Sequence, residues 1–333
     1  MMRAAVIVIL LRMRVSPNLF SGDMMPIVMF LRARMLPAMG NVRLWYHTRQ
    51  LTGGCVVSEP FLRSLFSLEG KVAVVTGGSG ALGAAMAKGL AQAGARVAIL
   101  ARRIEPVTAI VAAIETGGGT ALALSADVRE RAQVERACAT IVDRWERVDI
   151  LVNAAGGNMP GATLAPEASL LDLDPEAFRA VVDLNLIGVL LPSLVFGATM
   201  IAAPGQGTII NISSMAAQRP LTRIAGYSAA KAAVENLTRW MAIELARRYG
   251  SGLRVNAIAP GFFIGEQNRA LLLNPDGSLT ARGEHILAHT PAGRFGVPED
   301  LIATLIWLCS PGAAFVNGAV IPVDGGFSAF SGV

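Results

Sequence analysis

The sequence predicts an α/β protein with a doubly wound parallel sheet. From Lys71 onward, short runs rich in valine, isoleucine and alanine alternate with longer helical stretches, which is typical of buried parallel strands joined by helices. The first run ends in a glycine-rich turn that leads directly into a helical stretch, as the first strand of such a sheet does. No linker and no change in composition divides residues 67–333. We therefore expect one large domain over this range.

Seven strand-like runs follow one another in this domain. The first, Val72–Val75, is ended by glycines, as a buried parallel strand should be. A helix is expected over 82–93, because Gly94 follows at a position where glycine commonly ends helices. Helical stretches separate most of the later runs. These six runs lie near 96–101, 120–125, 149–153, 208–213, 253–258 and 319–323.

Residues 1–66 differ from the rest of the chain and are predicted to be an unstructured N-terminal extension. Eight of the 13 methionines lie within residues 1–39, and neither helical nor strand periodicity persists there. The apolar run over 4–11 is far shorter than the roughly 20 residues that cross a membrane, and it lacks a small-residue cleavage site. We interpret the segment as upstream sequence translated from a start site placed too early. Targeting or membrane attachment is the alternative.

The basic charge of the chain belongs to this extension. Within residues 1–66, eight arginines face only Asp23 and Glu59, a balance of +6, whereas the whole chain carries +5. Residues 67–333 therefore carry −1. A domain of this charge is not expected to present a basic face to nucleic acid.

The cysteine and histidine content argues against two further kinds of site. The three cysteines form no CxxC pair, and the three histidines form no HExxH pattern. Neither a disulfide framework nor a metal site is therefore expected. Scarce cysteine is typical of a reducing compartment, and we expect a cytoplasmic protein that is not attached to a membrane.

The glycine-rich turn, Thr76–Gly83, predicts a nucleotide cofactor. Gly78, Gly80 and Gly83 fit the pattern GxGxxG between a strand and a helix. In this context the glycines permit a tight turn and let backbone N–H groups approach a pyrophosphate at the helix N-terminus. Without the strand and the helix, the same glycines would indicate no more than a structural turn. The expected cofactor-binding residues of this turn are Gly77, Ser79, Gly80 and Leu82.

The end of the second strand favours NADP(H) over NAD(H). A carboxylate at this position would hold the ribose 2′-hydroxyl of NAD, and an arginine would suit the 2′-phosphate of NADP. The run Val97–Leu100 is followed by Ala101 and then by Arg102 and Arg103. Guanidinium groups are good partners for phosphate, so we expect Arg102 to bind it. NAD(H) is the alternative if these arginines are only part of a solvated face.

Three polar residues predict proton-transfer chemistry on a carbonyl. Tyr227 and Lys231 are four positions apart and so lie on one face of a helix. A nearby ammonium stabilises phenolate and should lower the pKa of Tyr227 from about 10. Ser214, which follows a predicted strand, offers a hydroxyl to a carbonyl oxygen. Tyrosine and lysine at this spacing are common by chance, and only their context supports a catalytic pair.

That context resembles the short-chain dehydrogenase/reductase family over essentially all of residues 67–333. The resemblance rests on motifs that occur in the family's order. They are Thr76–Gly83, Asp127, Asn153-Ala154-Ala155-Gly156, Asn185 in Asn185-Leu186-Ile187-Gly188, Ser214, the pair Tyr227 and Lys231, and Pro260-Gly261.

The resemblance implies a Rossmann-type fold and an NAD(P)-dependent oxidoreductase that acts on CH–OH groups. It implies that Tyr227 is the general acid or base, and that Lys231 lowers its pKa and holds the nicotinamide ribose. It further implies that Ser214 polarises the carbonyl and that Asn185 holds a water molecule in a proton relay. Family members of this kind are expected to be homotetramers.

The same resemblance implies further cofactor contacts. Asp127 would face the adenine, with Val128 beside it, and Asn153 would stabilise the central sheet near the cofactor. Pro260 and Gly261 would contact the cofactor after the sixth strand.

Several loops resemble one branch of the family, which contains the D-mannonate oxidoreductases (fructuronate reductases) of hexuronate metabolism. These loops are 156–158, 213–215, 261–269, 279–283 and 324–328. A sugar acid needs a cation for its carboxylate and amides or hydroxyls for its polyol chain, on loops at the strand carboxyl ends. Each candidate could instead fix a loop or lie on the surface. The candidate substrate-binding residues are Asn158, Ser214, Arg223, Gln267 and Arg269.

The implied reaction interconverts D-fructuronate and D-mannonate. Gluconate 5-dehydrogenase, or another polyol or aldonate dehydrogenase, is the first alternative. A 3-oxoacyl-carrier-protein reductase and a catalytically inactive cofactor-binding regulator are less favoured. The first of these two would need a basic docking patch, and the second conflicts with the intact set of Asn185, Ser214, Tyr227 and Lys231.

Overall fold

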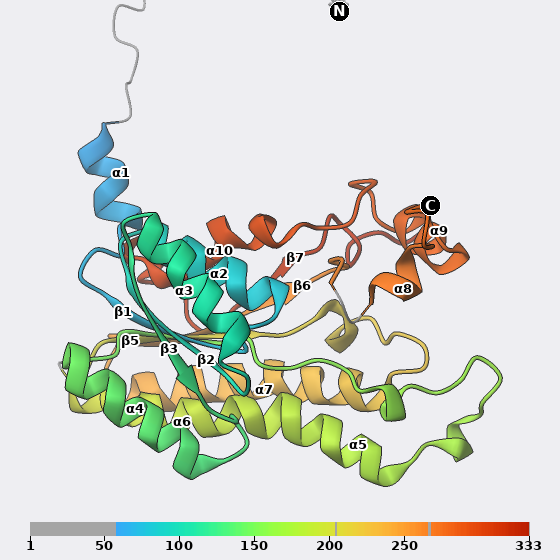
Figure 1. The fold of residues 1–333 in the computed structure, drawn as a ribbon, viewed down its shortest axis with the longest axis horizontal. Coiled ribbons are helices and arrows are strands. Elements are labelled where there is room, and N and C mark those ends of the chain that lie inside the picture. Colours follow the sequence, from blue (N-terminus) through green and yellow to red (C-terminus); the bar gives the residue numbers. More distant parts are fainter. Residues whose placement is uncertain (1–57, 204, 266–267, 333) are drawn as a thin grey trace, which may run out of the picture. The chain divides into compact units, whose positions relative to one another are not determined.

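The computed structural model describes residues 58–203, 205–265 and 268–332, and they contain a seven-stranded parallel sheet (Figure 1). The strand order is β3-β2-β1-β4-β5-β6-β7, and every neighbouring pair is parallel. The chain winds outward from β1 in one direction and from β4 in the other, so the crevice between these two strands is the topological switch point. The predicted doubly wound Rossmann-type sheet is confirmed.

All seven predicted strands are present, with ends that differ from the prediction by at most two residues. Runs of buried β-branched residues are typical of parallel strands that are covered on both faces, which is why these strands could be predicted. The bounds are β1 (Val72–Thr76), β2 (Arg96–Ala101), β3 (Thr120–Ser125), β4 (Ile150–Asn153), β5 (Gly207–Ile212), β6 (Leu253–Pro260) and β7 (Val320–Val323).

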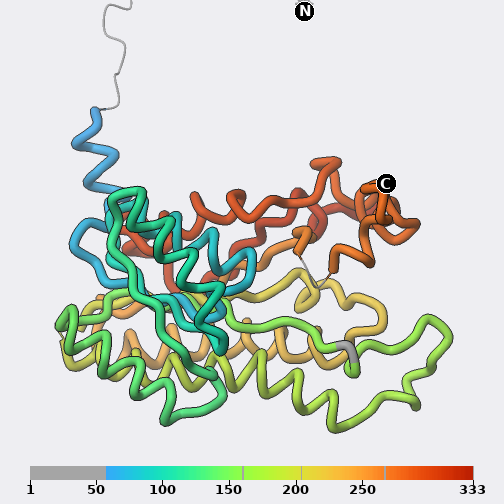
Figure 2. The backbone as a smooth tube through the Cα atoms, viewed as in Figure 1, coloured from blue at the N-terminus to red at the C-terminus, as the bar shows by residue number. Residues whose placement is uncertain are grey.

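Helices cover both faces of the sheet (Figure 1). Side chains from α2 (Ala81–Gln92), α3 (Glu105–Thr116) and α10 (Ile302–Cys309) form the core on one face. Side chains from α4 (Arg131–Trp145), α6 (Gly188–Ala202) and α7 (Ala225–Tyr249) form the core on the other. Two short helices, α8 (Arg269–Leu272) and α9 (Ala281–Ala288), lie beyond the carboxyl edge of the sheet. The C-terminal segment ends beside α9 (Figures 1 and 2). The ring centres of Phe330 and His289 are 6.4 Å apart.

The predicted boundary between the unstructured extension and the domain, at residue 66, is wrong, because a helix precedes it. Helix α1 (Glu59–Phe66) lies inside the segment that was expected to lack structure. The Ser58 hydroxyl accepts a hydrogen bond from the Phe61 N–H, and Pro60 occupies the first turn, so the helix has an ordinary N-terminal cap. Eight residues with no buried side chain are too short to produce a visible periodicity in the sequence. The rest of the predicted extension, residues 1–57, lies outside the described residues.

Helix α5 (Pro175–Val182) continues into α6 through a π turn at Asp183–Ile187. The combined helix Pro175–Ala202 is long and apolar enough to cross a membrane by length and composition alone. However, Phe196 and Met200 are fully buried in the core beneath the sheet, and the buried Ser193 is hydrogen-bonded within the fold. We therefore assign this helix to the layer of helices that packs against one face of the sheet.

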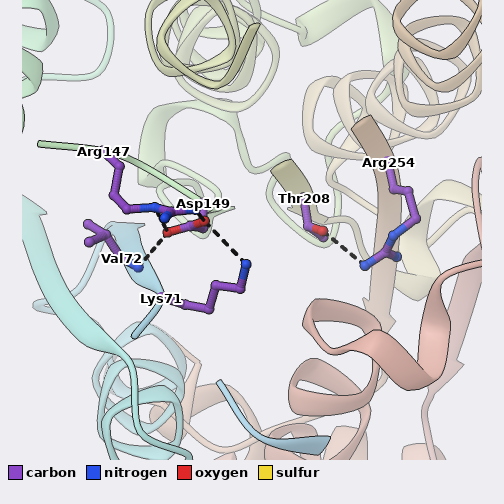
Figure 3. A network of polar contacts seen from close by, with 6 residues as sticks. All are labelled: Lys71, Val72, Arg147, Asp149, Thr208 and Arg254. Atoms are coloured by element: carbon purple, nitrogen blue, oxygen red, sulfur yellow. Dashed lines mark hydrogen bonds and ion pairs between the residues drawn. The ribbon is translucent and has the colours of Figure 1, made fainter. Parts of the chain in front are cut away.

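Two buried charged residues fix strands at the amino edge of the sheet (Figure 3). Before β4, the Asp149 carboxylate accepts hydrogen bonds from the Val72 N–H at 2.9 Å and from Arg147 Nε at 2.9 Å, and it pairs with Lys71 at 3.4 Å. It thereby joins β1 to β4. Arg254 on β6 donates to the Thr208 hydroxyl of β5 and to the Leu308 carbonyl of α10, each at 2.9 Å.

We expect Asp149→Ala to destabilise the protein by about 1–3 kcal/mol, because it leaves the buried Val72 N–H without its acceptor. Lys71→Ala removes a partly exposed ion pair and should cost less than about 1 kcal/mol. Urea unfolding of both variants tests this. Equal losses in the two variants would contradict the role given to the Val72 contact.

Candidate active site

The predicted site residues gather at the carboxyl edge of the sheet, around the switch point between β1 and β4. This edge is where open α/β sheets bind ligands. Thr76 at the end of β1 ties the two strands together here, because its hydroxyl accepts hydrogen bonds from the N–H groups of Ala154 and Ala155 at 3.2 and 3.1 Å. The loop after β4 is thus fixed beside the glycine-rich turn.

The glycine-rich turn is packed so closely that side chains are excluded at two positions. Gly77 has φ +67°, and a Cβ there would lie 2.6 Å from the Ala155 backbone. At Gly83 a Cβ would lie 2.4 Å from the Gly77 carbonyl oxygen. These contacts bring the start of α2 against the turn, as expected for the phosphate-binding loop of this fold.

The outer side of the same turn is open to a ligand. Ser79, Gly80 and Ala81 are exposed, and Gly80 precedes the first residue of α2 without a side-chain cap. The first N–H groups of a helix have no partner within it and attract anions. A nucleotide pyrophosphate therefore fits the residues present, and the contacts expected from Gly77, Ser79, Gly80 and Leu82 stay predictions.

Arg102 and Arg103 lie exposed at the carboxyl end of β2, as predicted. Within the described part of the chain, no salt bridge joins either guanidinium to a carboxylate. The Ser125 hydroxyl donates to the Arg102 carbonyl oxygen at 3.2 Å and fixes the backbone there. Both side chains can therefore reach a phosphate near the end of β2.

Asp127 has a partner that the sequence did not indicate. Its carboxylate accepts two hydrogen bonds from the Arg129 guanidinium, at 3.1 and 2.7 Å, and one from the Arg129 N–H at 3.0 Å, and these hold the pKa of Asp127 below its ordinary value. The side chain of Val128 is buried and lies against Gly188 at the start of α6. Only the backbone of Val128 is therefore available to a cofactor, and the predicted adenine contact of Asp127 stays a prediction.

Asn153 lies in a buried polar network beneath the site. Its amide nitrogen donates to Asn211 on β5 and to Ser193 on α6, both at 2.9 Å. Asn211 donates in turn to the Thr238 hydroxyl on α7 at 2.9 Å. Since buried polar groups are costly unless bonded, the network fixes α6 and α7 against the sheet. This arrangement agrees with the expected role of Asn153.

Asn185 clamps the loop after β4. Its side-chain oxygen accepts from the Gly157 N–H at 3.0 Å, and its nitrogen donates to the Gly157 carbonyl at 2.8 Å. It stands in the π turn, a feature that often marks functional sites. The relay water stays a prediction, and the side chain of Asn185 bonds both the N–H and the carbonyl of Gly157.

Lys231 comes from α7 and meets the same loop. Its ammonium donates to the Ile212 carbonyl at 2.7 Å, at the end of β5. A Cβ on Gly156 would lie 3.2 Å from Lys231 Nζ and 2.7 Å from the Asn185 side-chain oxygen. The structure thus brings Lys231, Asn185 and Gly156 together. It also explains why position 156 requires glycine, which the motif alone did not explain.

Tyr227 and Ser214 face each other beside Lys231. The Ser214 hydroxyl is close enough to affect the pKa of Tyr227, and Lys231 Nζ is 5.7 Å from the centre of the Tyr227 ring. Burial raises the pKa of Tyr227, and the interaction with Ser214 only partly opposes this. The prediction that the pKa of Tyr227 lies below its ordinary value is therefore wrong for this structure, because desolvation of the phenolate has the larger effect.

Pro260 and Gly261 lie at the carboxyl end of β6, as predicted. The Gly261 N–H donates to the Val323 carbonyl of β7 at 3.0 Å. A Cβ on Gly261 would lie 2.7 Å from the Asp324 Cα. The close approach fixes this loop over the site, and their cofactor contacts stay predictions.

The predicted substrate residues are less well gathered. Asn158 donates to Thr163, and its side-chain oxygen is buried without a protein partner among the described residues. Arg223 is fixed to Leu164, because its guanidinium and carbonyl bond the Leu164 carbonyl and N–H, respectively. This geometry favours the loop-fixing role for Arg223 over substrate binding. Arg269 is exposed at the start of α8, and Gln267 lies outside the described residues.

The comparisons with known proteins agree with this geometry. A family model described as Enoyl-(Acyl carrier protein) reductase matches residues 78–328. An uncharacterized oxidoreductase of Bacillus subtilis strain 168, UxuB, is 48% identical over 276 residues, which are 80% of this chain and 98% of the relative. The chain belongs to the short-chain dehydrogenase/reductase family.

Two solved structures are similar to this chain over nearly their whole length. A Haemophilus protein provisionally named a D-mannonate oxidoreductase, with bound NAD, is 41% identical with a TM-score of 0.75, and the match covers 82% of this chain and 100% of that one. A Burkholderia cenocepacia gluconate 5-dehydrogenase in complex with NADP and tartrate is 35% identical with a TM-score of 0.72, covering 80% and 99%. This chain is accordingly an NAD(P)-dependent oxidoreductase that acts on alcohol groups.

The buried Lys231 should make stability depend on pH. Burial lowers its pKa from 10.5 to about 8, so between these values the unfolded chain binds a proton that the folded protein does not. The free energy of unfolding should therefore rise with pH across this window by on the order of 3 kcal/mol relative to Lys231→Met. Urea unfolding of both proteins between pH 7 and 10.5 measures the difference. A difference that does not change with pH would exclude the lowered pKa.

Proposed function

We propose that this enzyme interconverts a keto sugar acid and the corresponding hydroxy acid, and that the pair is D-fructuronate and D-mannonate in hexuronate metabolism. The contact of Tyr227 with Ser214 next to Lys231 carries the proposal, since it provides an acid and a carbonyl ligand at one place. The loops at 156–158 and 261–269 and the similarity to a provisionally named D-mannonate oxidoreductase support this substrate class.

In the proposed reduction, the chain positions the keto group and moves one proton. Ser214 donates a hydrogen bond to the keto oxygen, and Tyr227 transfers its proton to that oxygen as the new C–H bond forms. The bound nicotinamide supplies the hydride. Lys231, which is cationic at neutral pH because its pKa is about 8, stabilises the phenolate that Tyr227 leaves behind. Asn185 holds the loop Gly156–Gly157 in place beside Lys231.

The proposal extends to the cofactor, the oligomeric state and the cellular location of the enzyme. Arg102, exposed without a carboxylate partner in the described ranges, supports a preference for NADP(H) over NAD(H). Leu194, Trp240 and Ile243 are exposed on α6 and α7, and the last two are each 60% accessible. Such apolar side chains on neighbouring helices support a subunit interface and hence the homotetramer. We also propose that the enzyme is cytoplasmic.

A second candidate function is a gluconate 5-dehydrogenase or another aldonate dehydrogenase. The similarity to the Burkholderia cenocepacia enzyme favours it. In both keto acids the keto group is at C5 counted from the carboxylate, and the two acids differ in the configuration of a hydroxyl-bearing carbon, so substrate choice separates the candidates.

We expect fructuronate to be reduced with a higher kcat/KM than tagaturonate or 5-ketogluconate. The measurement is the absorbance of NADH or NADPH at 340 nm with each acid. Tyr227→Phe should lower kcat by at least about 100-fold, because it removes the proton donor. A preference for 5-ketogluconate would establish the second candidate instead, and no turnover of any acid would overturn the proposal.

We expect NADPH to give the higher kcat/KM in the wild type. Arg102→Ala should lower kcat/KM for NADPH by about 10- to 100-fold, because it removes a charged hydrogen bond to phosphate. The same variant should leave kcat/KM for NADH unchanged, which serves as the control. A wild type without preference for NADPH would contradict the assignment of Arg102.

We expect light scattering after size exclusion to give four times the mass of one chain. Trp240→Glu should dissociate the assembly, since it places a charge in the proposed apolar interface. Replacement of the exposed Arg144 on α4 by Glu is the control. A wild type that elutes as a monomer would refute the tetramer.

A further inference from the structure

Glu235 is a buried carboxylate on α7 that the reaction described above does not use. It is 5% exposed. It follows Lys231 by four residues and Tyr227 by eight, so the three side chains lie along one stripe of the helix. A carboxylate in such a place is costly unless several donors satisfy it, and its donors indicate what it does.

The donors come from both ends of the short segment that carries Ser214. Glu235 Oε1 accepts from the Ser213 hydroxyl at 3.0 Å. The Gln218 side-chain amide donates to both carboxylate oxygens, at 3.2 and 3.3 Å. Ser213 immediately precedes Ser214, and Gln218 follows the 3₁₀ turn η4 (Met215–Ala217). The carboxylate therefore holds the segment at both ends.

Two further hydrogen bonds complete this frame. Lys231 Nζ donates to the Ile212 carbonyl at 2.7 Å, directly before Ser213. The Ser214 hydroxyl oxygen accepts from the Ala216 N–H at 3.2 Å, within the 3₁₀ turn. Helix α7 thus carries Tyr227 and also holds the backbone on which Ser214 stands.

We propose that Glu235 is a positioning residue, which through Ser213 and Gln218 fixes the Ser214 hydroxyl in its place beside Tyr227. The inference rests on the roles proposed above for Ser214 and Tyr227, but it does not depend on which sugar acid is the substrate.

A purely stabilising role for Glu235 makes a different prediction. Its one salt-bridge partner in the described residues is Arg239, at 3.4 Å, and the Arg239 side chain is about half exposed. The other charged side chain on the same stripe is Lys231. If Glu235 only paired with Arg239 and stabilised α7, its removal would change the unfolding temperature and leave the Ser214–Tyr227 contact intact.

The test compares Glu235→Ala with Glu244→Ala. Glu244 also forms an ion pair with an arginine four residues later on α7, Arg248, but none of the hydrogen bonds made by the Ser213–Gln218 side chains in the described structure involves Glu244. Protein labelled with ¹³C at the tyrosine Cζ gives a signal that responds to hydrogen bonding of each hydroxyl. The chain has three tyrosines, and Tyr227→Phe assigns the signal of Tyr227. Ser214→Ala gives the reference for a lost contact.

We expect the Tyr227 signal in Glu235→Ala to move toward its position in Ser214→Ala, and to stay in place in Glu244→Ala. With the acid that the wild type reduces, kcat should fall about 10- to 100-fold in Glu235→Ala, as for a misplaced catalytic group. The affinity for NADPH, measured by its fluorescence, should not change. Glu235→Gln keeps the side-chain shape and one acceptor, and should recover part of kcat.

An unmoved Tyr227 signal in folded Glu235→Ala would overturn the inference, as would an equal loss of kcat in Glu244→Ala. If Glu235→Ala does not fold, Ser213→Ala and Gln218→Ala each remove one donor and should each move the signal in the same direction; no movement in either would also overturn the inference. Because the signal needs no substrate, a wild type inactive on the acid panel would refute the proposed function without deciding the role of Glu235.

Discussion

The pairing of β1 with β4 is the constraint on which the site depends. These two strands are adjacent in space but far apart in the chain, and the winding of the sheet reverses between them. At their carboxyl ends the backbones of Gly77 and Ala155 approach so closely that no side chain fits at Gly77. Thr76 bonds the N–H groups of Ala154 and Ala155 at the same place. The glycine-rich turn and the loop after β4 are therefore one rigid unit. At the other end of the same strands, Asp149 fixes β1 to β4.

Helix α7 is the second rigid element of the site. Its 25 residues carry the tyrosine and the lysine, and polar side chains along its length hold β5 and the segment of Ser214. A site built on a helix packed against a sheet keeps its geometry better than one built on loops. In contrast, the residues proposed to bind the substrate lie on loops after β4 and β6, where one family can change specificity without changing the chemistry.

The fold could be predicted from the sequence. Strands buried on both faces need unbroken runs of β-branched residues, and such runs can be recognised in a single sequence. The sequence also predicted which elements carry Ser214, Tyr227 and Lys231 and that the three lie together, while their catalytic roles stay predictions. It was not sufficient for Glu235, whose donors Ser213 and Gln218 are 22 and 17 positions away. Such contacts depend on how α7 packs on β5. Arg223 had the charge that a sugar acid needs, but its φ of +74° and its bonds to Leu164 became visible only in the structure.

The π turn at Asp183–Ile187 has a consequence for how this chain tolerates change in length. A π turn contains one residue more than the α-helical turn it replaces, and each residue turns a helix by about 100°. Deleting one residue there would restore regular helix, but it would rotate α6 relative to α5. Either Asn185 would leave Gly157, or Phe196 and Met200 would leave the core. Functional relatives should therefore vary here by substitution and hardly ever by insertion or deletion.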